Sequence, residues 1–410
     1  MARRSSSADA TVDSIDSIAS ALEHKSVVIC CGAGGVGKTT IAAAFGDVAR
    51  RRTGGRVLVL TIDPAKRLAN ALGLESVGNV ERRINNSDDA GGELWVAMLD
   101  TSSSWDDLVR AHAPDPATAT KILANPLYRN ITERFVQSHD YIAMERLYEL
   151  RASGRFDLIV IDTPPSRHAL DFLDAPERMA DFFSSKLLRW ITMPYRLGGE
   201  RAGRLGYLAA KPFYQVADRI LGSQFLADIA EFFLLFQSMY DGFVTRARAV
   251  TELLRDPATA FVVVSSLEPA PLHEAEFFMQ ELERRGHHLG ALVFNRVLPD
   301  DFRDARARAG ATRVITASAV ERKRLGSVDE NRVFANVAES FLRFAALADH
   351  EQAQRRRLAH RPATMVSIPL QDHDITDLPS LSLLGDLLWP PAGRVVPLGR
   401  ARNARSKPAS

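Results

Sequence analysis

The sequence predicts an α/β fold with a mostly parallel, doubly wound sheet, flanking helices and an inserted helical subdomain. Three observations point to this class. Short runs rich in Val, Ile and Leu alternate with stretches of helical periodicity, as in chains built from strand–helix–strand units. The runs are continuous rather than alternating, which is typical of strands buried on both faces. Three of the runs end in glycine-rich or acidic residues, at the edge where parallel sheets bind ligands.

Seven runs are expected to form the strands of this sheet. They span residues 26–33, 56–63, 93–99, 156–162, 259–266, 290–296 and 364–370. About 55 residues separate the third and fourth runs and nearly 100 separate the fourth and fifth, whereas a simple crossover needs far fewer. The excess predicts helical insertions at about 101–150 and 177–255.

The second insertion is rich in aromatic side chains, because 13 of the 69 residues from 177 to 245 are Phe, Tyr or Trp. Phe225, Ile229, Phe232 and Phe236 fall on one helical stripe. Such a stripe is typical of a buried helical core, and it also suits a hydrophobic groove for a client helix or membrane segment. Both interpretations stay open, since a change of dimer or nucleotide state could alternately bury and expose the stripe.

Composition limits the class of protein. The chain has 410 residues, is 46% hydrophobic and 25% charged, and carries a formal charge of +2, which gives no reason to expect nucleic acid as a partner. Its two cysteines, Cys30 and Cys31, are adjacent in a predicted strand, so their thiols should point to opposite faces. There is no signal-peptide core and no run of about 18 apolar residues. We therefore expect a reduced, cytoplasmic protein that could lie peripherally at the membrane.

A glycine loop follows the first predicted strand. Residues 32–39 match G-x-x-x-x-G-K-[ST], in which backbone N–H groups surround phosphate oxygens at the start of a helix. We expect Gly34, Gly35, Val36 and Gly37 to contact phosphate through the backbone. Lys38 would reach the β- and γ-phosphates, Thr39 would bind Mg²⁺ through its hydroxyl, and Thr40 would add a further phosphate contact.

The same glycines also match a dinucleotide fingerprint, with Asp63 in the place of a ribose-binding acid. Two features favour a nucleoside triphosphate instead. Lys38 and Thr39 have no purpose in a dinucleotide site. Asp162 ends the apolar run "LIVID". Four apolar residues followed by Asp are typical of the Walker B motif, in which the carboxylate contributes to Mg²⁺ binding in nucleoside triphosphatases.

The motifs "GGVGKTT", "TIDPAKRLANALG" and "IDTPPSRHALDFL" resemble, in this order, those of the arsenite-pump and tail-anchored-protein-targeting ATPases, the ArsA-like family of P-loop NTPases. The resemblance covers most of residues 25–390 and is strongest to an actinobacterial branch. It implies a dimer that closes over ATP and Mg²⁺ and opens after hydrolysis. We accordingly expect a P-loop ATPase domain over residues 25–392, between a disordered segment at 1–24 and a basic disordered tail at 393–410.

The resemblance also implies roles for single residues. Asp63, followed by Pro64, matches the first switch, in which the Asp positions or activates water. Asp162, Thr163, Pro165 and His168 match the second switch, in which the Asp holds Mg²⁺ through water. Asn295 matches the purine-reading asparagine of the family, and Pro369 matches a late loop that packs on the base. The aromatic insertion matches the position of the client-binding subdomain.

Ala33 is the largest departure from the family pattern K-G-G-x-G-K-[ST], in which the first Lys reaches the partner's phosphates across the dimer. A methyl group cannot supply that charge, and cations of this kind contribute on the order of 10³-fold or more to the rate. The first hypothesis, which we prefer, is a heterodimer with a related, lysine-bearing ATPase subunit. In the second hypothesis Arg167, Lys66 or Arg67 substitutes, and in the third the chain is a slow nucleotide sensor.

The family labels leave the physiological role open. The two cysteines lie in the predicted strand that enters the loop, so the sequence does not support arsenite binding. The leading interpretation is an ATPase that acts on a hydrophobic client helix or an integral membrane protein. The alternatives are a MinD/ParA-like nucleotide-switched scaffold, which a C-terminal segment broken by Pro and Gly disfavours, and the energising subunit of an anion transporter.

Overall fold

The computed structural model describes most of the central chain. Described are residues 16–22, 24–62, 67–74, 78–84, 91–99, 106–110, 113–125, 128, 136–164, 173–174, 178, 232, 239–318 and 328–390. Outside them lie Asp63, Pro64, Pro165, Arg167 and His168, together with Lys66, the side chain of Arg67 and most of the aromatic segment 177–245.

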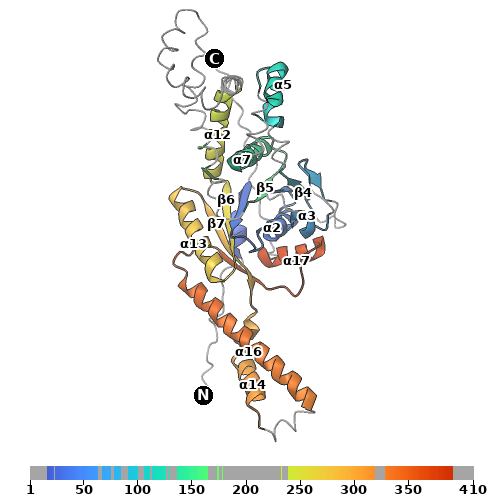
Figure 1. Cartoon of the computed structure of the whole chain (residues 1–410), viewed down its shortest axis with the longest axis vertical. Coiled ribbons are helices and arrows are strands. Elements are labelled where there is room, and N and C mark those ends of the chain that lie inside the picture. Colours follow the sequence, from blue (N-terminus) through green and yellow to red (C-terminus); the bar gives the residue numbers. More distant parts are fainter. Residues whose placement is uncertain are drawn as a thin grey trace, which may run out of the picture.

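The strands of the described chain form one sheet of mixed direction (Figure 1). They are β1 (Val27–Gly32), β2 (Arg56–Thr61), β3 (Arg82–Arg83), β4 (Glu93–Met98), β5 (Leu158–Asp162), β6 (Thr259–Ser265), β7 (Leu289–Val297) and β8 (Met365–Pro369). Their order is β3-β4-β2-β5-β1-β6-β7-β8, and every neighbouring pair is parallel except β3 with β4.

This sheet confirms the predicted class and all seven predicted strands. The apolar runs became strands because β1, β5 and β6 are buried along their whole length, as parallel strands covered on both faces must be. The sequence did not predict β3, since it consists of two exposed arginines and carries no apolar pattern.

Helices cover both faces of the sheet. The helices of the described chain are α1 (Asp16–Leu22), α2 (Lys38–Thr53), α3 (Arg67–Ala71), α5 (Pro116–Ala124), α7 (Val136–Ala152), α12 (Tyr240–Arg255), α13 (Pro269–Arg284), α14 (Ala305–Thr316), α16 (Val328–Arg357) and α17 (Leu378–Leu388), with the short 3₁₀ helix η1 (Asp300–Arg303). One buried cluster joins α1, α2, α3 and α17 to the sheet, and another joins α5, α7, α12 and α13 to its other face. Cys31 belongs to the second cluster and Cys30 to the first, so the two thiols point to opposite faces as predicted.

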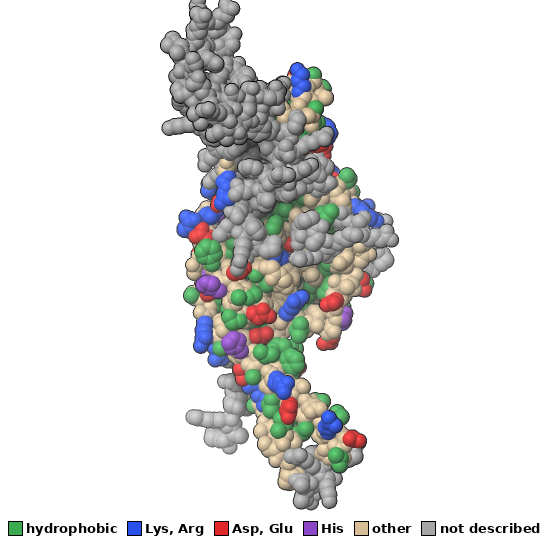
Figure 2. Space-filling model, viewed as in Figure 1, with side chains coloured by type: hydrophobic (Ala, Val, Ile, Leu, Met, Phe, Trp, Pro, Cys, Tyr) green, Lys and Arg blue, Asp and Glu red, His purple; other side chains and the backbone are tan. Residues whose placement is uncertain are grey.

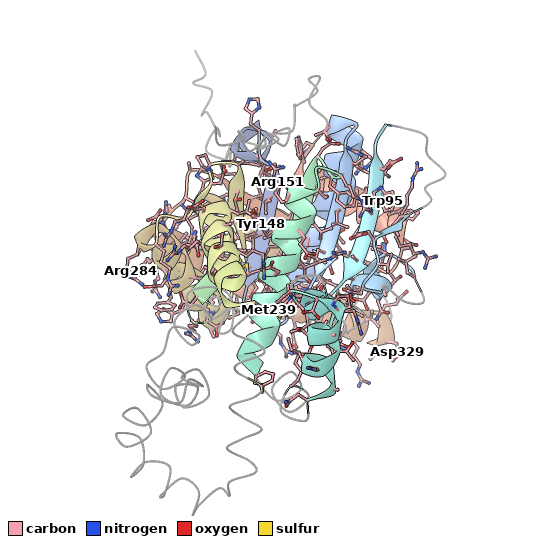
Figure 3. The ribbon with its side chains drawn as sticks, turned by 90° about the horizontal axis from the view of Figure 1, so that it is seen from above. Trp95, Tyr148, Arg151, Met239, Arg284 and Asp329 are labelled. Atoms are coloured by element: carbon pink, nitrogen blue, oxygen red, sulfur yellow. The ribbon has the colours of Figure 1, made fainter. Side chains whose placement is uncertain are left out.

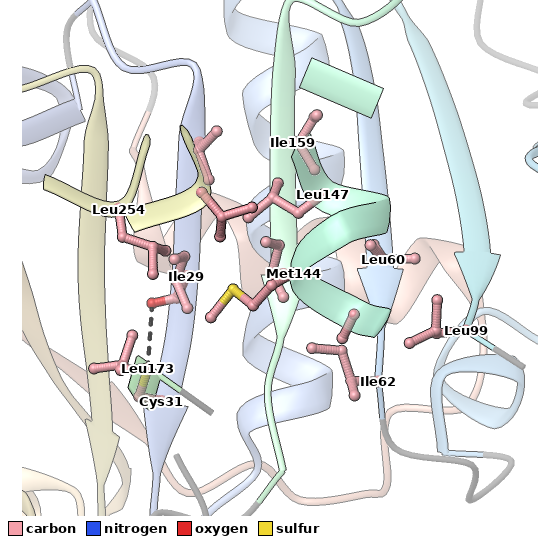
Figure 4. Close-up of a cluster of buried hydrophobic side chains, with 14 of the residues drawn as sticks. Ile29, Cys31, Leu60, Ile62, Leu99, Met144, Leu147, Ile159, Leu173 and Leu254 are labelled. Atoms are coloured by element: carbon pink, nitrogen blue, oxygen red, sulfur yellow. Dashed lines mark hydrogen bonds between the residues drawn. The ribbon is translucent and has the colours of Figure 1, made fainter. Parts of the chain in front are cut away.

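The described parts of the two insertions pack directly on the sheet. Met144 and Leu147 of α7 lie against Ile29 and Ile159, as Figure 4 shows. Seen from above, α7 runs beside α12 (Figure 3), and a buried ion pair at 2.5 Å joins Glu145 of α7 to Arg246 of α12. These helices therefore share a core with the sheet, while the predicted subdomain boundaries stay a prediction.

Helices α14 and α16 pack on each other and project from the sheet (Figure 1). Figure 2 shows hydrophobic side chains on the surface of this pair, and Val333, Val337 and Leu347 of α16 are more than half exposed. Although α16 has 30 residues, no described helix is long and apolar enough to cross a membrane.

Candidate nucleotide-binding site

The carboxyl ends of β1, β7 and β8 border one cavity of about 560 Å³. Its lining includes the glycine loop after β1, Thr163 after β5, Asn295 of β7 and Pro369 of β8. Asn70 and Ala71, in the helix that follows the predicted first switch, also line it. A cavity of this size at this edge of a parallel sheet is a usual place for a small ligand.

The glycine loop has a backbone that only glycine adopts readily. Gly35 has a φ of 82° and Gly37 a φ of 91°, both in the left-handed region. Gly37 caps the N-terminus of α2, and no side chain of the loop accepts a hydrogen bond from the first N–H groups of that helix. Those N–H groups and the positive end of the helix dipole suit an anion in the cavity.

Lys38 lies on the inner side of this loop. Its side chain is buried, and its Nζ donates a hydrogen bond of 2.8 Å to the carbonyl oxygen of Ala33. Ala33 is itself 6% exposed and adds only a methyl group at the position where the resemblance in the sequence analysis implies a lysine. The described loop therefore holds one ammonium group, which can reach a phosphate bound to the loop.

Asp162 is fully buried at the end of β5, next to both β1 and β2. The hydroxyl of Thr39 donates to its Oδ2 at 2.7 Å, and the hydroxyl of Thr61 donates to the same oxygen at 2.9 Å. Parallel register explains the meeting, since Asp162 is the register partner of Cys30 on one side and of Thr61 on the other. A carboxylate and a hydroxyl both offer oxygen atoms as metal ligands, and Mg²⁺ prefers oxygen ligands.

The second-switch segment begins beside this carboxylate. Thr163 donates from both its backbone N–H and its hydroxyl to the carbonyl oxygen of Cys30, at 3.2 and 2.8 Å.

The burial of Cys31 raises its pKa to about 12, and burial together with nearby Asp162 raises the pKa of Cys30. Both thiols are therefore protonated near neutral pH and serve as packing groups.

Asn295 connects the far side of the cavity to the loop. Its Nδ2 donates to the carbonyl oxygen of Val36 at 2.8 Å, and its Oδ1 accepts from the N–H of Arg296 at 3.0 Å. Within the described part of the chain, these contacts leave one N–H and one lone pair of the amide for a ligand, as reading a purine edge requires. Pro369 ends β8 in the same lining, and its carbonyl oxygen accepts from Gln371 Nε2 at 2.7 Å.

Helix α17 fixes the segment that follows Pro369. Asp47 of α2 is fully buried and accepts hydrogen bonds from Arg50, Arg51 and Ser382. Arg51 also pairs with Asp386 at 2.8 Å, so the ion pairs join α17 to α2. Because α2 begins at the glycine loop, this packing fixes the position of the loop relative to the segment that follows Pro369.

The structure thus brings together many of the predicted site residues. The cavity lining includes Gly35, Gly37, Lys38, Thr39, Thr40, Thr163, Asn295 and Pro369. Asp162 is not part of the lining but accepts a hydrogen bond from the lining residue Thr39. Outside the described residues lie Asp63, Pro64, Pro165 and His168. Sequence reasoning did not assign Arg296, Asn70 or Gln371 to the site, although Asn70 lies within the motif "TIDPAKRLANALG".

The fit to a nucleotide is chemical as well as spatial. The loop has glycines in the left-handed region and leads into a helix N-terminus that lacks a side-chain cap. Together with one buried lysine and the oxygen pair of Thr39 and Asp162, these features match a nucleoside triphosphate with Mg²⁺. A phosphate loop between the first strand and helix of a parallel sheet, with a carboxylate at the end of the neighbouring strand, defines a P-loop NTPase.

Comparison with known proteins narrows this class. A sequence model described as "Anion-transporting ATPase" matches residues 25–339, so the chain belongs to the ArsA family of ATPases. This confirms the family that the sequence motifs suggested.

Several curated proteins are similar to the chain. An uncharacterized protein of Streptomyces coelicolor is 29% identical, over 67% of this chain and 63% of its own length. A putative arsenical pump-driving ATPase of Aquifex aeolicus is 26% identical, over 68% of this chain and 82% of its own. The ATPase GET3 of Malassezia globosa is 24% identical, over 68% of this chain and 75% of its own length. The match thus spans less than two thirds of the Streptomyces protein.

Proposed function

We propose that this chain is an ATP-binding subunit of a dimeric ATPase and that it completes its active site with a cation from a related subunit. The observation that carries the proposal is the meeting of Lys38, Thr39 and Asp162 around a glycine loop that has Ala33 at the family's lysine position. The described loop holds the residues that a subunit supplies to its own site, whereas the lysine that it would supply to its partner's site is replaced by Ala33.

Within this proposal each residue has a defined task. The loop N–H groups and Lys38 hold the β- and γ-phosphates, and Thr39 and Asp162 hold the Mg²⁺, which neutralises phosphate charge when bound. Asn295 and Pro369 hold the base. Asp63 orients the attacking water, and Thr61, two residues before it, already contacts Asp162, so the chain enters this segment beside the metal-binding carboxylate. Pro64, Pro165 and His168 belong to the two switches.

The missing cation supports a heterodimer over a homodimer. Two copies of this chain would leave both sites with a methyl group at position 33, whereas a lysine-bearing subunit would complete the site of this chain. The substitutes weighed from the sequence, Lys66, Arg67 and Arg167, stay proposals, because their side chains lie outside the described residues.

Coupling to a hydrophobic client or membrane partner is a further part of the proposal. Its support is the aromatic segment 177–245 and the names of two relatives, an arsenical pump-driving ATPase and the ATPase GET3. Co-purification from the host tests it: short membrane proteins would favour a client, and a polytopic transporter would favour pumping. Recovery of the ATPase with neither would count against this part.

The binding half of the proposal is tested by calorimetric titration of the full chain with ATP and Mg²⁺. We expect Lys38→Ala to weaken ATP binding by about a hundredfold, since it removes the one buried ammonium of the described loop. Lys25→Ala is a matched control, because Lys25 is also a mostly buried lysine that donates to a carbonyl, that of Pro257, on the amino-terminal side of the sheet. Equal ATP affinity in the unmodified chain and the Lys38 variant would contradict the proposal.

A further inference from the structure

A backbone irregularity turns Arg296 toward the nucleotide cavity. The β7–β8 register shifts between Phe294 and Val297, so Asn295 and Arg296 leave the regular ladder. Arg296 has a φ of 60°, a conformation that is uncommon for a residue with a side chain and that persists where its surroundings enforce it. Bulges of this kind commonly re-aim a side chain beside a functional site.

The contacts of this pair show where the guanidinium lies. Asn295 donates to the carbonyl oxygen of Val36, and Nη1 of Arg296 lies 3.5 Å from the carbonyl oxygen of Gly35, the preceding residue of the glycine loop. The side chain of Arg296 is exposed and lines the same cavity. Among the described residues of that lining, Lys38 and Arg296 are the lysine and arginine side chains.

Sheet order places Arg296 far from the metal-binding end of the cavity. Two strand spacings separate β7 from β1, which is about 10 Å, and β5 with Asp162 lies one spacing further away. Thr39 and Asp162 mark the end where the terminal phosphate and Mg²⁺ would lie. Arg296 stands at the opposite end, next to Asn295, with Pro369 one strand away as the register partner of Val297.

We propose that Arg296 binds the base of the nucleotide by stacking its planar guanidinium on the purine ring, between the phosphate loop and the 369–376 segment. An exposed guanidinium beside a base-reading amide has the right shape and charge, because arginine stacks on aromatic faces while its charge attracts the ring electrons. The inference rests on the proposed function, since it assumes that the cavity takes ATP. It assigns Arg296 a role in the affinity for the base, so we do not propose Arg296 as the substitute for the missing lysine.

The test compares three probes on the full chain in the presence of Mg²⁺: ATP, AMP and inorganic tripolyphosphate. Arg296→Gly removes the guanidinium and accepts the same backbone angle without strain. Arg296→Lys keeps the charge and loses the plane. Arg248→Ala, a change at an exposed arginine of α12, is the control, and thermal unfolding checks that each variant is folded.

If Arg296 stacks on the base, Arg296→Gly weakens ATP and AMP by the same factor, about tenfold, and leaves tripolyphosphate unchanged. The ATP affinity of Arg296→Lys then lies between that of the unmodified chain and that of Arg296→Gly. A loss for tripolyphosphate as large as that for ATP, or no loss for any probe, overturns the inference. If the unmodified chain binds none of the three probes, the proposed function itself fails. If it binds ATP normally and Arg296→Gly binds ATP equally well, only the inference about Arg296 fails.

Discussion

At the scale of single residues, the site depends on a backbone that tolerates few side chains. Gly37 combines a left-handed φ with a position directly under Asn295, where an added Cβ would lie 2.4 Å from Nδ2. The amide would have to shift, because an atom cannot approach a Cβ so closely. One residue thereby joins the glycine loop to the Asn295 side of the cavity.

We predict that Gly37→Ala lowers ATP affinity at least tenfold, because it displaces Asn295 and narrows the phosphate loop. Backbone strain should cost about 1–2 kcal/mol of stability in addition. Gly286→Ala is the matched control, since Gly286 also has a positive φ, of 75°, and no neighbour within 4 Å of an added Cβ. Calorimetric titration with ATP should separate the two variants, and equal affinity in both would contradict this role of Gly37.

Arg296 shows why part of the site could not be read from the sequence. The glycine loop and Asp162 follow motifs whose spacing reflects phosphate and metal chemistry, and Asn295 was predicted from the resemblance to the family's purine-reading asparagine. Arg296 depends on a local register shift between β7 and β8, which arises from tertiary packing and leaves no periodic signal. Its position next to Asn295 in the chain was the one available hint.

At the scale of elements, the strands were predictable and the helical additions were less so. A continuous apolar run buried on both faces has few alternatives to a parallel strand, so all seven runs matched. Helices α14 and α16 keep much of their surface in water, so their pattern carries little information about where they pack. Their projection from the sheet was not predicted.

The ion pair between α7 and α12 gives a prediction at this scale. Glu145 is 3% and Arg246 16% exposed at the side chain, so either alone would be a poorly solvated charge. We expect Glu145→Leu to lower the free energy of unfolding by about 3 kcal/mol, and the double variant with Arg246→Leu to recover much of the loss. Urea unfolding of the three proteins measures this, and a double variant less stable than Glu145→Leu would argue against the pairing.

His287 gives a pH prediction for the packing of α13, α12 and β6. Burial lowers its pKa below the ordinary 6.5, although the Nδ1–H donates a hydrogen bond of 3.1 Å to the carbonyl oxygen of Leu254, which acts in the opposite direction. The unfolded chain therefore binds a proton near pH 6.5 that the folded chain resists, and this group makes stability fall as pH drops below about 6.5.

We expect His287→Asn to lose less stability than the unmodified chain between pH 7.5 and pH 5.5, because the amide keeps a donor and does not titrate. The comparison is the change in urea midpoint across that range. His273→Asn, at an exposed histidine of α13, serves as control. Identical pH profiles for His287→Asn and the unmodified chain would contradict the assignment.

At the scale of the whole molecule, the chain contains a nearly complete site within one subunit. The family comparison places the chain in the ArsA family of ATPases, in keeping with its fold and cavity, and the sequence motifs indicate Ala33 as its departure from the family pattern. Under the proposed function, a subunit that receives a cation and donates none works with a partner of a different kind, so the dimer that we propose is asymmetric.

The central claim is tested most directly by the steady-state rate of ATP hydrolysis, measured for the chain alone and mixed in equal amounts with a lysine-bearing ArsA-family subunit from the same organism. We predict slow turnover alone and a rise on the order of 10³-fold in the mixture. To isolate this chain's site, the partner carries a change of its own phosphate-loop threonine, and the rise disappears when its signature lysine is also replaced by alanine. Fast hydrolysis by the chain alone, unchanged by the partner, would contradict the account.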